Sequence, residues 1–276
     1  MSKISIVTAF FDIGRGDWST EIEKNGGPLP HYLQRSVDKY IEHFKRMCEI
    51  DTEIVVYTTK DVAARLRTIS KTVKIVEYDY FNLHKDYRDQ IEKIQNSAEF
   101  TKKINPYQAR NPEYWSKDYV GVTSLKAFFV SDAFERGLIT NEFASWVDFG
   151  YCRDEGHVPK SKKWEYDFSP GLMHYFNYRE PVLRQMNIQI AQAVQNNVVY
   201  IIGGVFVGQK EQWKTLKSYM KESMDHLMSR GLVDDDQGLL LMSYFINPDM
   251  FELHPMPLDA PQEDVRSILR KFNKYE

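Results

Sequence analysis

Short apolar runs alternate with amphipathic stretches at the start of the chain. The runs 4–11, 53–58 and 72–76 are rich in β-branched and aromatic residues, which is typical of buried strands. Between them, the stretch 32–47 places apolar residues at helical spacing, and 61–69 predicts a second, shorter helix. Strands that alternate with helices in this way predict right-handed parallel crossovers within one sheet.

A further buried strand is predicted just before the middle of the chain. Residues 119–136 have a helical apolar rhythm that stops at Gly137, a common signal for the end of a helix. The apolar run 143–147 follows, and Asp148 comes directly after it. Since ligands bind at the carboxyl ends of strands in open α/β sheets, we expect Asp148 at a ligand-binding edge.

The second half of the chain is less regular. The aromatic-rich stretch 164–178 gives no periodic signal, and a run of acidic residues, Asp234 to Asp236, precedes an apolar helical pattern. The elements we predict here are a helix at 182–194, a strand at 198–202, a turn and second strand at 203–208, and then a long helix at 209–230, a helical stretch at 238–245 and a strand at 250–253.

Together these elements predict one α/β domain over residues 1–276, with a mostly parallel central sheet flanked by helices. We expect a nucleotide-binding half at 1–150 and a half facing the second substrate at 151–276. A net charge of −3 and a pI near 6.2 are unlike those of a nucleic-acid-binding protein, which normally has a basic face. The expected partner is therefore a small molecule rather than nucleic acid.

Cysteine content and hydrophobicity bear on where the protein works. Only Cys48 and Cys152 are present, too few for a disulfide framework, so a reducing compartment is the simplest interpretation. The apolar run 4–11 is far shorter than the roughly 20 residues of a membrane-spanning helix. We expect a cytoplasmic protein that does not cross the membrane.

The end of the first predicted strand is the first candidate binding segment. Backbone groups at Thr8 and Ala9, together with Arg15, could contact a nucleotide base and its phosphates. The alternative is an ordinary strand followed by a surface arginine. Neither a Gly-x-Gly-x-x-Gly fingerprint nor a P-loop follows the strand, so the two best-known nucleotide motifs are excluded.

Two charged residues before and after the strand 143–147 form the second candidate. Lys126 can neutralise a diphosphate, and Asp148 can bind a ribose hydroxyl or a divalent cation. A solvated helix face for Lys126 and a turn-capping role for Asp148 remain as alternatives.

The third candidate is Gly204 followed by Asp235, Asp236 and Gln237, in which the glycine allows close approach of a ligand and the acidic segment could supply a catalytic base. Helix capping would explain the same aspartates.

The order of these segments resembles the GT-A glycosyltransferase fold, in which a nucleotide-binding half ends in an Asp-x-Asp strand. More specifically, the segments 8–16, 112–116 and 146–151 are similar to those of the bacterial HtrL/YibB family, regarded as glycosyltransferase-like and associated with surface-polysaccharide gene sets. The resemblance covers most of the chain and implies a nucleotide-sugar donor.

In one respect the sequence departs from the GT-A pattern. The second aspartate of Asp-x-Asp, the usual metal contact, is replaced by Gly150. Mn²⁺ or Mg²⁺ binding is therefore in question, although Asp148 keeps its expected role at the ribose. Asp154 or Glu155 could substitute from the following loop, and His254 stands where many members of the fold have a third metal ligand. We expect Asp148 and His254 as the metal ligands if a metal binds.

The predicted function is therefore transfer of a sugar from a nucleoside-diphosphate sugar, with UDP expected from the resemblance. The acceptor would be a saccharide or a lipid-linked saccharide in surface polysaccharide assembly. Two alternatives remain: a sugar nucleotidyltransferase, and a non-catalytic carbohydrate- or nucleotide-binding protein of the same fold. Residues 264–276 place Val265, Ile268, Leu269 and Phe272 at helical spacing among basic residues. This segment predicts either peripheral contact with an anionic membrane or a terminal helix docked on the domain.

Overall fold

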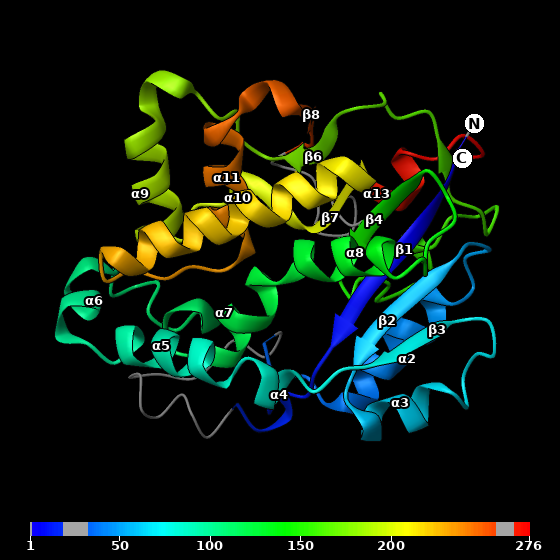
Figure 1. Ribbon diagram of the computed structural model, residues 1–276, viewed down its shortest axis with the longest axis horizontal. Helices are drawn as coiled ribbons and strands as arrows, with labels where there is room; N and C mark the ends of the chain where they lie inside the picture. Colours follow the sequence, from blue (N-terminus) through cyan, green and yellow to red (C-terminus); the bar gives the residue numbers. More distant parts are fainter. Residues whose placement is uncertain (1, 19–32, 258–267) are drawn as a thin grey trace.

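The computed structural model describes residues 2–18, 33–257 and 268–276, which form a mixed α/β fold (Figure 1). In these residues one eight-stranded sheet has the order β3-β2-β1-β4-β7-β6-β8, and β5 pairs with β1 outside this order. The strands are β1 (Ser2–Phe10), β2 (Ile54–Thr58), β3 (Lys74–Glu77), β4 (Phe143–Val147), β5 (Glu165–Tyr166), β6 (Met173–Asn177), β7 (Ile201–Gln209) and β8 (Phe251–Pro255).

The first half of the sheet is parallel, as the sequence predicts. Strand β1 pairs in parallel with β2 and β4, and β2 pairs in parallel with β3. Val7 of β1 lies between Val55 of β2 and Trp146 of β4, and all three side chains are buried. Continuous apolar runs are required here because helices cover both faces of these strands.

The second half of the sheet corrects the sequence-based expectation. We predicted a turn and a new strand at 203–208, but β7 is a single strand from Ile201 to Gln209 that runs antiparallel to β4 and β6. Its glycines leave room for a neighbouring side chain instead of making a turn. Strand β6, which pairs in parallel with β8, lies in the aromatic stretch for which no element was predicted. The sheet is therefore mixed: the predicted parallel pairing holds for β3-β2-β1-β4 and for β6-β8, and β7 is antiparallel to both of its neighbours.

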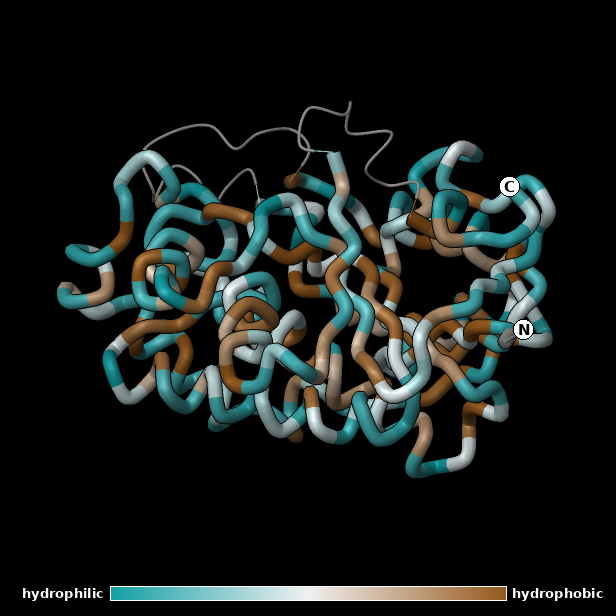
Figure 2. The backbone as a smooth tube through the Cα atoms, turned by 90° about the horizontal axis from the view of Figure 1, so that it is seen from above, coloured by the Kyte–Doolittle hydropathy of each residue, from teal (hydrophilic) through white to brown (hydrophobic). Residues whose placement is uncertain are grey.

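Helices cover both faces of the sheet. Two buried clusters, one on each face, fill the space between sheet and helices, with Phe129, Trp146 and Trp213 in one and Phe44 and Phe149 in the other. Hydrophobic segments run mainly through the interior and hydrophilic ones along the rim (Figure 2). The first face is covered by α7 (Lys117–Ser124), α8 (Lys126–Glu135), α9 (Met186–Asn196), α10 (Lys210–Ser229) and α11 (Asp236–Ile246). Three shorter helices lie beside these: α4 (Tyr80–Leu83), α5 (Lys85–Gln95) and α6 (Ala98–Lys103). The second face is covered by α2 (Val37–Met47), α3 (Lys60–Leu66) and α13 (Ile268–Lys271).

The C-terminal helix is docked on the domain. Ile268 and Leu269 are fully buried, and the backbone N–H of Ile268 donates a hydrogen bond to the Tyr151 hydroxyl at 3.2 Å. The apolar side chains that would have to enter a lipid surface are therefore already packed, which corrects the membrane-contact interpretation for this part of 264–276. Val265 and Arg266 lie outside the described residues. None of the described helices is long and apolar enough to span a membrane.

Candidate functional site

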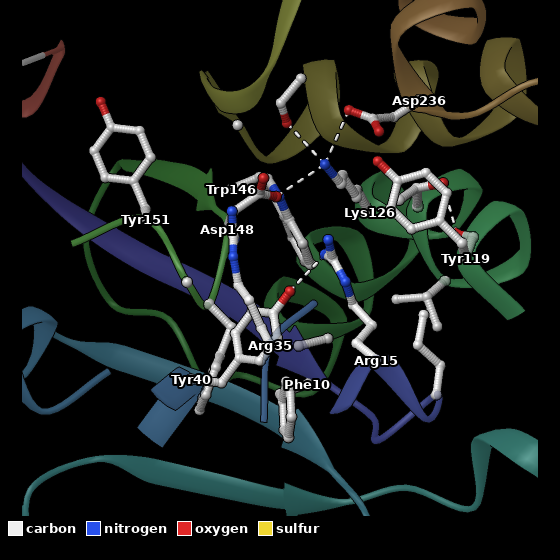
Figure 3. Close-up of a pocket in the computed structure, with 18 of the residues that line it drawn as sticks. Phe10, Arg15, Arg35, Tyr40, Tyr119, Lys126, Trp146, Asp148, Tyr151 and Asp236 are labelled. Atoms are coloured by element: carbon white, nitrogen blue, oxygen red, sulfur yellow. Dashed lines mark hydrogen bonds and ion pairs between the residues drawn. The ribbon is translucent and has the colours of Figure 1, made fainter. Parts of the chain in front are cut away.

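A cavity of about 440 Å³ opens at the carboxyl edge of the sheet (Figure 3). Strands β1 and β4 end there, and β7 begins there because it runs in the opposite direction. A volume in this range fits a small-molecule ligand. The described residues that contribute most of its polar lining are Asp12, Arg15, Arg35, Tyr40, Tyr119, Lys126, Asp148, Arg153, Asp236 and Gln237.

Lys126 joins three elements at the centre of this site. It is the first residue of α8, and its ammonium group is buried. Its Nζ lies 2.8 Å from Asp148 Oδ1 at the end of β4 and 2.9 Å from Asp236 Oδ2 at the start of α11. The third acceptor is the carbonyl oxygen of Gly203 in β7, also at 2.9 Å. An ammonium group has three protons to donate, so these three acceptors account for all of them.

The glycine pair of β7 makes this arrangement sterically possible. A Cβ atom at Gly203 would lie 1.7 Å from Asp236 Oδ2, so any larger residue would displace that carboxylate. Gly204 is less constrained, because a Cβ there would lie 3.5 Å from Asp148 Oδ2, an ordinary contact distance. The carbonyl of Gly204 accepts the backbone N–H of Asp148 at 2.9 Å and so fixes the start of the loop.

The two carboxylates bound by Lys126 differ in exposure. The Asp148 side chain is 45% exposed, and its Oδ1 also accepts a hydrogen bond from Trp146 Nε1 at 2.8 Å. Its Oδ2 takes part in neither of these bonds. The Asp236 side chain is only 4% exposed. Burial raises the pKa of Asp236 to about 8 although Lys126 opposes the shift. Burial lowers the pKa of Lys126, but Asp148 and Asp236 outweigh it and the net shift is upward.

Further acidic side chains lie near Asp236 in the interior of the protein. Two of them, Glu113 and Asp234, were given no role from the sequence. Glu113 and Asp234 are buried, and burial raises the pKa of each well above its usual value, with Asp235 adding to the shift. Among the described residues, Glu113 Oε1 has no hydrogen-bond partner. Tyr119 donates to Asp235 Oδ2 at 3.5 Å. Glu113 lies in the family-like segment 112–116, which was the one signal that could have pointed to it.

Two arginines and a tyrosine form the opposite wall of the cavity (Figure 3). Arg15 donates to the Tyr40 hydroxyl at 2.5 Å and, through Nε and Nη2, to the carbonyl oxygen of Leu33. Its guanidinium also lies 4.7 Å from the centre of the Trp18 ring. Arg35 lies 5.8 Å from the centre of the Tyr40 ring. The two guanidinium groups give this wall a positive charge, and hydrogen bonds hold that of Arg15 in place.

Most of the residues predicted from the sequence meet in the cavity, and three do not. Thr8 is fully buried within β1, two residues before its end, and Asp235 caps α11 by accepting the N–H of Gln237 at 2.9 Å. Neither lines the cavity, and neither does His254. The predicted residues that line the cavity are Ala9, Arg15, Lys126, Asp148, Gly204, Asp236 and Gln237.

His254 belongs to a different cluster, so the predicted metal pair of Asp148 and His254 is not assembled. Successive side chains of a strand point to opposite faces, and His254 faces the side of the sheet that α13 covers. Its ring lies 4.9 Å from that of Phe272, and its Nε2 lies 3.1 Å from His174 Nδ1. Burial, and secondarily the neighbouring His174, lowers the pKa of His254 to about 4.

The surroundings of Asp148 do not fit a resident Mn²⁺ or Mg²⁺ ion. The ammonium group of Lys126 already compensates the carboxylate and would repel a cation beside it. A Cβ atom at Gly150 would lie 2.7 Å from Tyr40 Cε1, so the missing second carboxylate has no space. Of the two suggested substitutes, Asp154 instead caps a short 3₁₀ helix and pairs with His157 at 2.7 Å, and Glu155 is the first residue of that helix.

This fold and site define a mixed α/β domain with a cavity lined by charged residues at the carboxyl edge of its sheet. The chain belongs to the HtrL/YibB family: the family model described as "Bacterial protein of unknown function (HtrL_YibB)" matches residues 2–260. The chain is also 37% identical over 255 residues to "Protein HtrL" of Escherichia coli (strain K12), a match that covers 92% of this chain and 88% of that protein. The resemblance of the sequence to the HtrL/YibB family is thereby confirmed.

Solved structures provide more distant similarities. Mouse xyloside xylosyltransferase 1, in its apo form, superposes with a TM-score of 0.41 at 12% identity, covering 91% of this chain and 84% of that one. Mannose-1-phosphate geranyltransferase from Thermus thermophilus gives a TM-score of 0.34 at 10% identity, covering 83% of this chain and 65% of that one.

Proposed function

We propose that this protein is a glycosyltransferase that uses a nucleoside-diphosphate sugar. The observation that carries the proposal is a pair of carboxylates on the wall of one cavity. Asp148 and Asp236 both bind the Lys126 ammonium group, which lies between them. One carboxylate is half exposed and suits a hydroxyl-rich ligand. The other is buried with a raised pKa and suits proton transfer. Both lie at the sheet edge where α/β proteins bind ligands.

The opposite wall of the cavity would hold the nucleotide. Arg15 and Arg35 supply the positive charge that a diphosphate needs, and guanidinium groups match phosphate oxygens in geometry. Asp148 Oδ2 would accept a hydrogen bond from a ribose hydroxyl. The contact of Lys126 with phosphate that we expected from the sequence does not form part of the proposal, because its three protons are already donated. Lys126 instead acts as a positioning residue for the two carboxylates.

Asp236 is the proposed base. In an inverting transfer the acceptor hydroxyl gives its proton to the Asp236 carboxylate while its oxygen bonds to the anomeric carbon. The bond from that carbon to the diphosphate oxygen breaks, and the nucleoside diphosphate leaves. A pKa near 8 suits this role, because a general base works best when its pKa is close to the working pH. In a retaining transfer the same carboxylate would stabilise positive charge on the sugar.

Donor and acceptor identities rest on the family resemblance alone. We propose a UDP-sugar as donor and a saccharide or lipid-linked saccharide of surface polysaccharide as acceptor. The reaction would take place in the cytoplasm. Because the residues around Asp148 do not fit a divalent cation, the proposal includes donor binding without Mn²⁺ or Mg²⁺.

A panel of nucleotide sugars tests the proposal directly. A donor bound only by the folded protein raises the melting temperature, and slow donor hydrolysis releases the nucleoside diphosphate. We expect the Asp236→Asn variant to bind the donor normally and to lose about 10²–10⁴-fold in turnover, the usual contribution of a general base. The matched control is Asp225→Asn, which makes the same chemical change on the exposed surface of α10.

The products separate the alternatives. Release of pyrophosphate in place of a nucleoside diphosphate would identify a nucleotidyltransferase. Donor binding without turnover in any acceptor mixture would identify a binding protein of the same fold. Failure of every nucleoside diphosphate to shift the melting temperature at millimolar concentration would remove the donor site altogether.

A further inference from the structure

A second polar cluster lies on the opposite face of the sheet from Lys126. His174 of β6 and Glu252 and His254 of β8 project from the same face of two paired strands, where His174 lies directly opposite Glu252. Each of these three side chains offers one possible metal-ligand atom, and the three atoms lie within 4.8 Å of one another. Among the described residues, this is the cluster of His, Cys, Asp or Glu side chains that could hold a metal ion. His174 is fully buried, while the Glu252 side chain is 37% exposed.

The hydrogen bonds fix which nitrogen of His174 is free to bind. His174 Nε2 lies 2.9 Å from the carbonyl oxygen of Ser169, which can only accept, so Nε2 carries the hydrogen. His174 Nδ1 therefore presents a lone pair, and it faces His254 Nε2 and Glu252 Oε2. A histidine that donates one ring N–H to a backbone carbonyl and offers the other nitrogen to a shared centre has the usual arrangement of a metal ligand.

The distances between the two ring nitrogens and the two carboxylate oxygens of Glu252, either of which could be the third ligand, have the scale of a tetrahedral metal site. His174 Nδ1 is 3.1 Å from His254 Nε2 and 3.6 Å from Glu252 Oε2, and His254 Nε2 is 4.0 Å from Glu252 Oε1. Ligands at about 2.0–2.1 Å from a tetrahedral zinc ion are about 3.3–3.4 Å apart. With one oxygen of Glu252 as ligand, the three ligand atoms lie within 4.8 Å of one another, and rotation of the partly exposed carboxylate would bring that oxygen closer to both nitrogens.

We propose that His174, Glu252 and His254 bind a zinc ion, with water as the fourth ligand on the side where Glu252 is exposed. Two imidazole nitrogens and one carboxylate favour zinc over magnesium or calcium, which prefer oxygen ligands. On binding, His254 carries its hydrogen on Nδ1, so that Nε2 can coordinate. Both imidazoles are neutral in this state, and the carboxylate leaves the site a net charge of +1.

Aromatic side chains surround the cluster on the face of the sheet that α13 covers. The rings of Phe168, Phe176 and Phe272 pack around His254, at centre-to-centre distances of 5.9, 5.4 and 4.9 Å. Such a shell limits access of water and fixes the orientation of the ligands. Strand β8 is at the end of the sheet and has one partner strand, β6, among the described residues. A zinc ion would fasten this edge strand to β6, and its role is independent of the proposed transferase chemistry.

The test uses the full-length protein without a histidine tag. The protein is treated with a chelator, returned to metal-free buffer and titrated with Zn²⁺, and in parallel with Co²⁺, whose visible absorption reports tetrahedral coordination. We expect one ion per chain and a higher melting temperature in Zn²⁺. In the variants His254→Gln and Glu252→Gln we expect zinc affinity to fall at least about tenfold. His226→Gln, on the exposed surface of α10, is the matched control and should bind zinc as the wild type does.

Two results would overturn the proposal. One is a wild-type protein that binds neither Zn²⁺ nor Co²⁺ after chelation, which would leave the cluster as hydrogen-bonded histidines only. The other is a zinc affinity that stays the same in the His254→Gln and Glu252→Gln variants, which would place the ion elsewhere. The wild-type titration decides the question even if one variant does not fold.

Discussion

The two polar clusters of this protein balance their charges in opposite ways. Around Lys126 the chain supplies both signs itself, with one ammonium group between two carboxylates. Around His174 the chain supplies a carboxylate and two neutral imidazoles, and among the described residues Glu252 forms no ion pair with a lysine or arginine. The first cluster therefore disfavours an added cation, while the second can accept one. The number of carboxylate and imidazole groups in each cluster does not predict this difference; the presence or absence of a neighbouring ammonium group does.

The largest effect should come from removing the ammonium group. Lys126→Met removes the donor that Asp148, Asp236 and the Gly203 carbonyl share, so we expect a loss of about 3–5 kcal/mol in the free energy of unfolding, measured in urea at about pH 9, above the pKa of Asp236. Adding Asp236→Asn should restore part of this loss, because the uncompensated charge is then removed. Lys214→Met on the exposed face of α10 is the control. A single variant as stable as the wild type would show that Lys126 does not balance the cluster.

A smaller loss is expected when the glycine beside Asp236 is enlarged. Gly203→Ala places a Cβ where Asp236 Oδ2 now lies, and we expect it to cost about 1–3 kcal/mol, as overpacking does in other cores. Gly204→Ala meets only ordinary contacts and should stay within about 0.5 kcal/mol of the wild type. Chemical denaturation of both variants provides the comparison. Equal losses in the two would mean that strand propensity, rather than Asp236, sets the cost.

The buried acids behind Asp236 should make stability depend on pH. The folded protein holds a proton on Glu113 at pH values where the unfolded chain has released it, because burial raises its pKa. This contribution is complete below the ordinary pKa of glutamate and is lost as pH rises toward the folded value. Asp234, Asp235 and Asp236 shift in the same direction, so we expect the melting temperature to fall as the buffer becomes alkaline.

Glu113→Gln isolates one part of this dependence. Glutamine resembles the protonated acid but does not titrate, so at about pH 8 we expect the variant to melt about 2–4 °C above the wild type, the shift that 1 kcal/mol gives in a domain of this size. At about pH 4 the two should melt together. Differential scanning fluorimetry across pH measures the difference, with Glu211→Gln on the surface as control. A constant offset at every pH would indicate a packing effect instead of a retained proton.

The smallest effect concerns divalent cations in the Lys126 cavity. We expect Mg²⁺ or Mn²⁺ to change the dissociation constant for UDP by less than about twofold, or about 0.4 kcal/mol. Isothermal titration with and without each ion measures this. A large gain in UDP affinity with Mn²⁺ would mean that the cation displaces Lys126 from Asp148. It would contradict the conclusion that the Lys126 cluster disfavours an added cation.

The parallel half of the fold could be predicted from the sequence because its strands are buried on both faces. Each therefore appears as an unbroken apolar run, and Asp148 stands out as the polar residue at the end of one. Strand β6 could not be found in this way, since His174 and Asn177 interrupt its apolar pattern. The glycine pair of β7 was misread for a related reason. Glycine signals a turn locally, whereas here its small size serves a contact with Asp236.

The site was predicted only as far as single residues carry their own signal. Lys126, Asp148 and Asp236 each follow or precede an apolar element, so their positions could be inferred one at a time. That the Lys126 ammonium group joins the two carboxylates could not be inferred, because Asp236 lies 110 positions from Lys126 in the sequence. The same limit applies to His254, whose partner His174 lies 80 residues earlier. Only the paired strands reveal that the two rings meet.

The fit of the Tyr40 ring against Gly150 also restricts how sequences of this kind can vary. A carboxylate side chain in place of Gly150 requires the ring to leave, and the ring contacts Phe10 while its hydroxyl accepts a hydrogen bond from Arg15. The two positions should therefore change together: relatives that carry an aspartate in place of this glycine should have a small residue in place of the tyrosine. A chain that combined the bulkier side chain with the tyrosine would have to rebuild the wall that holds Arg15.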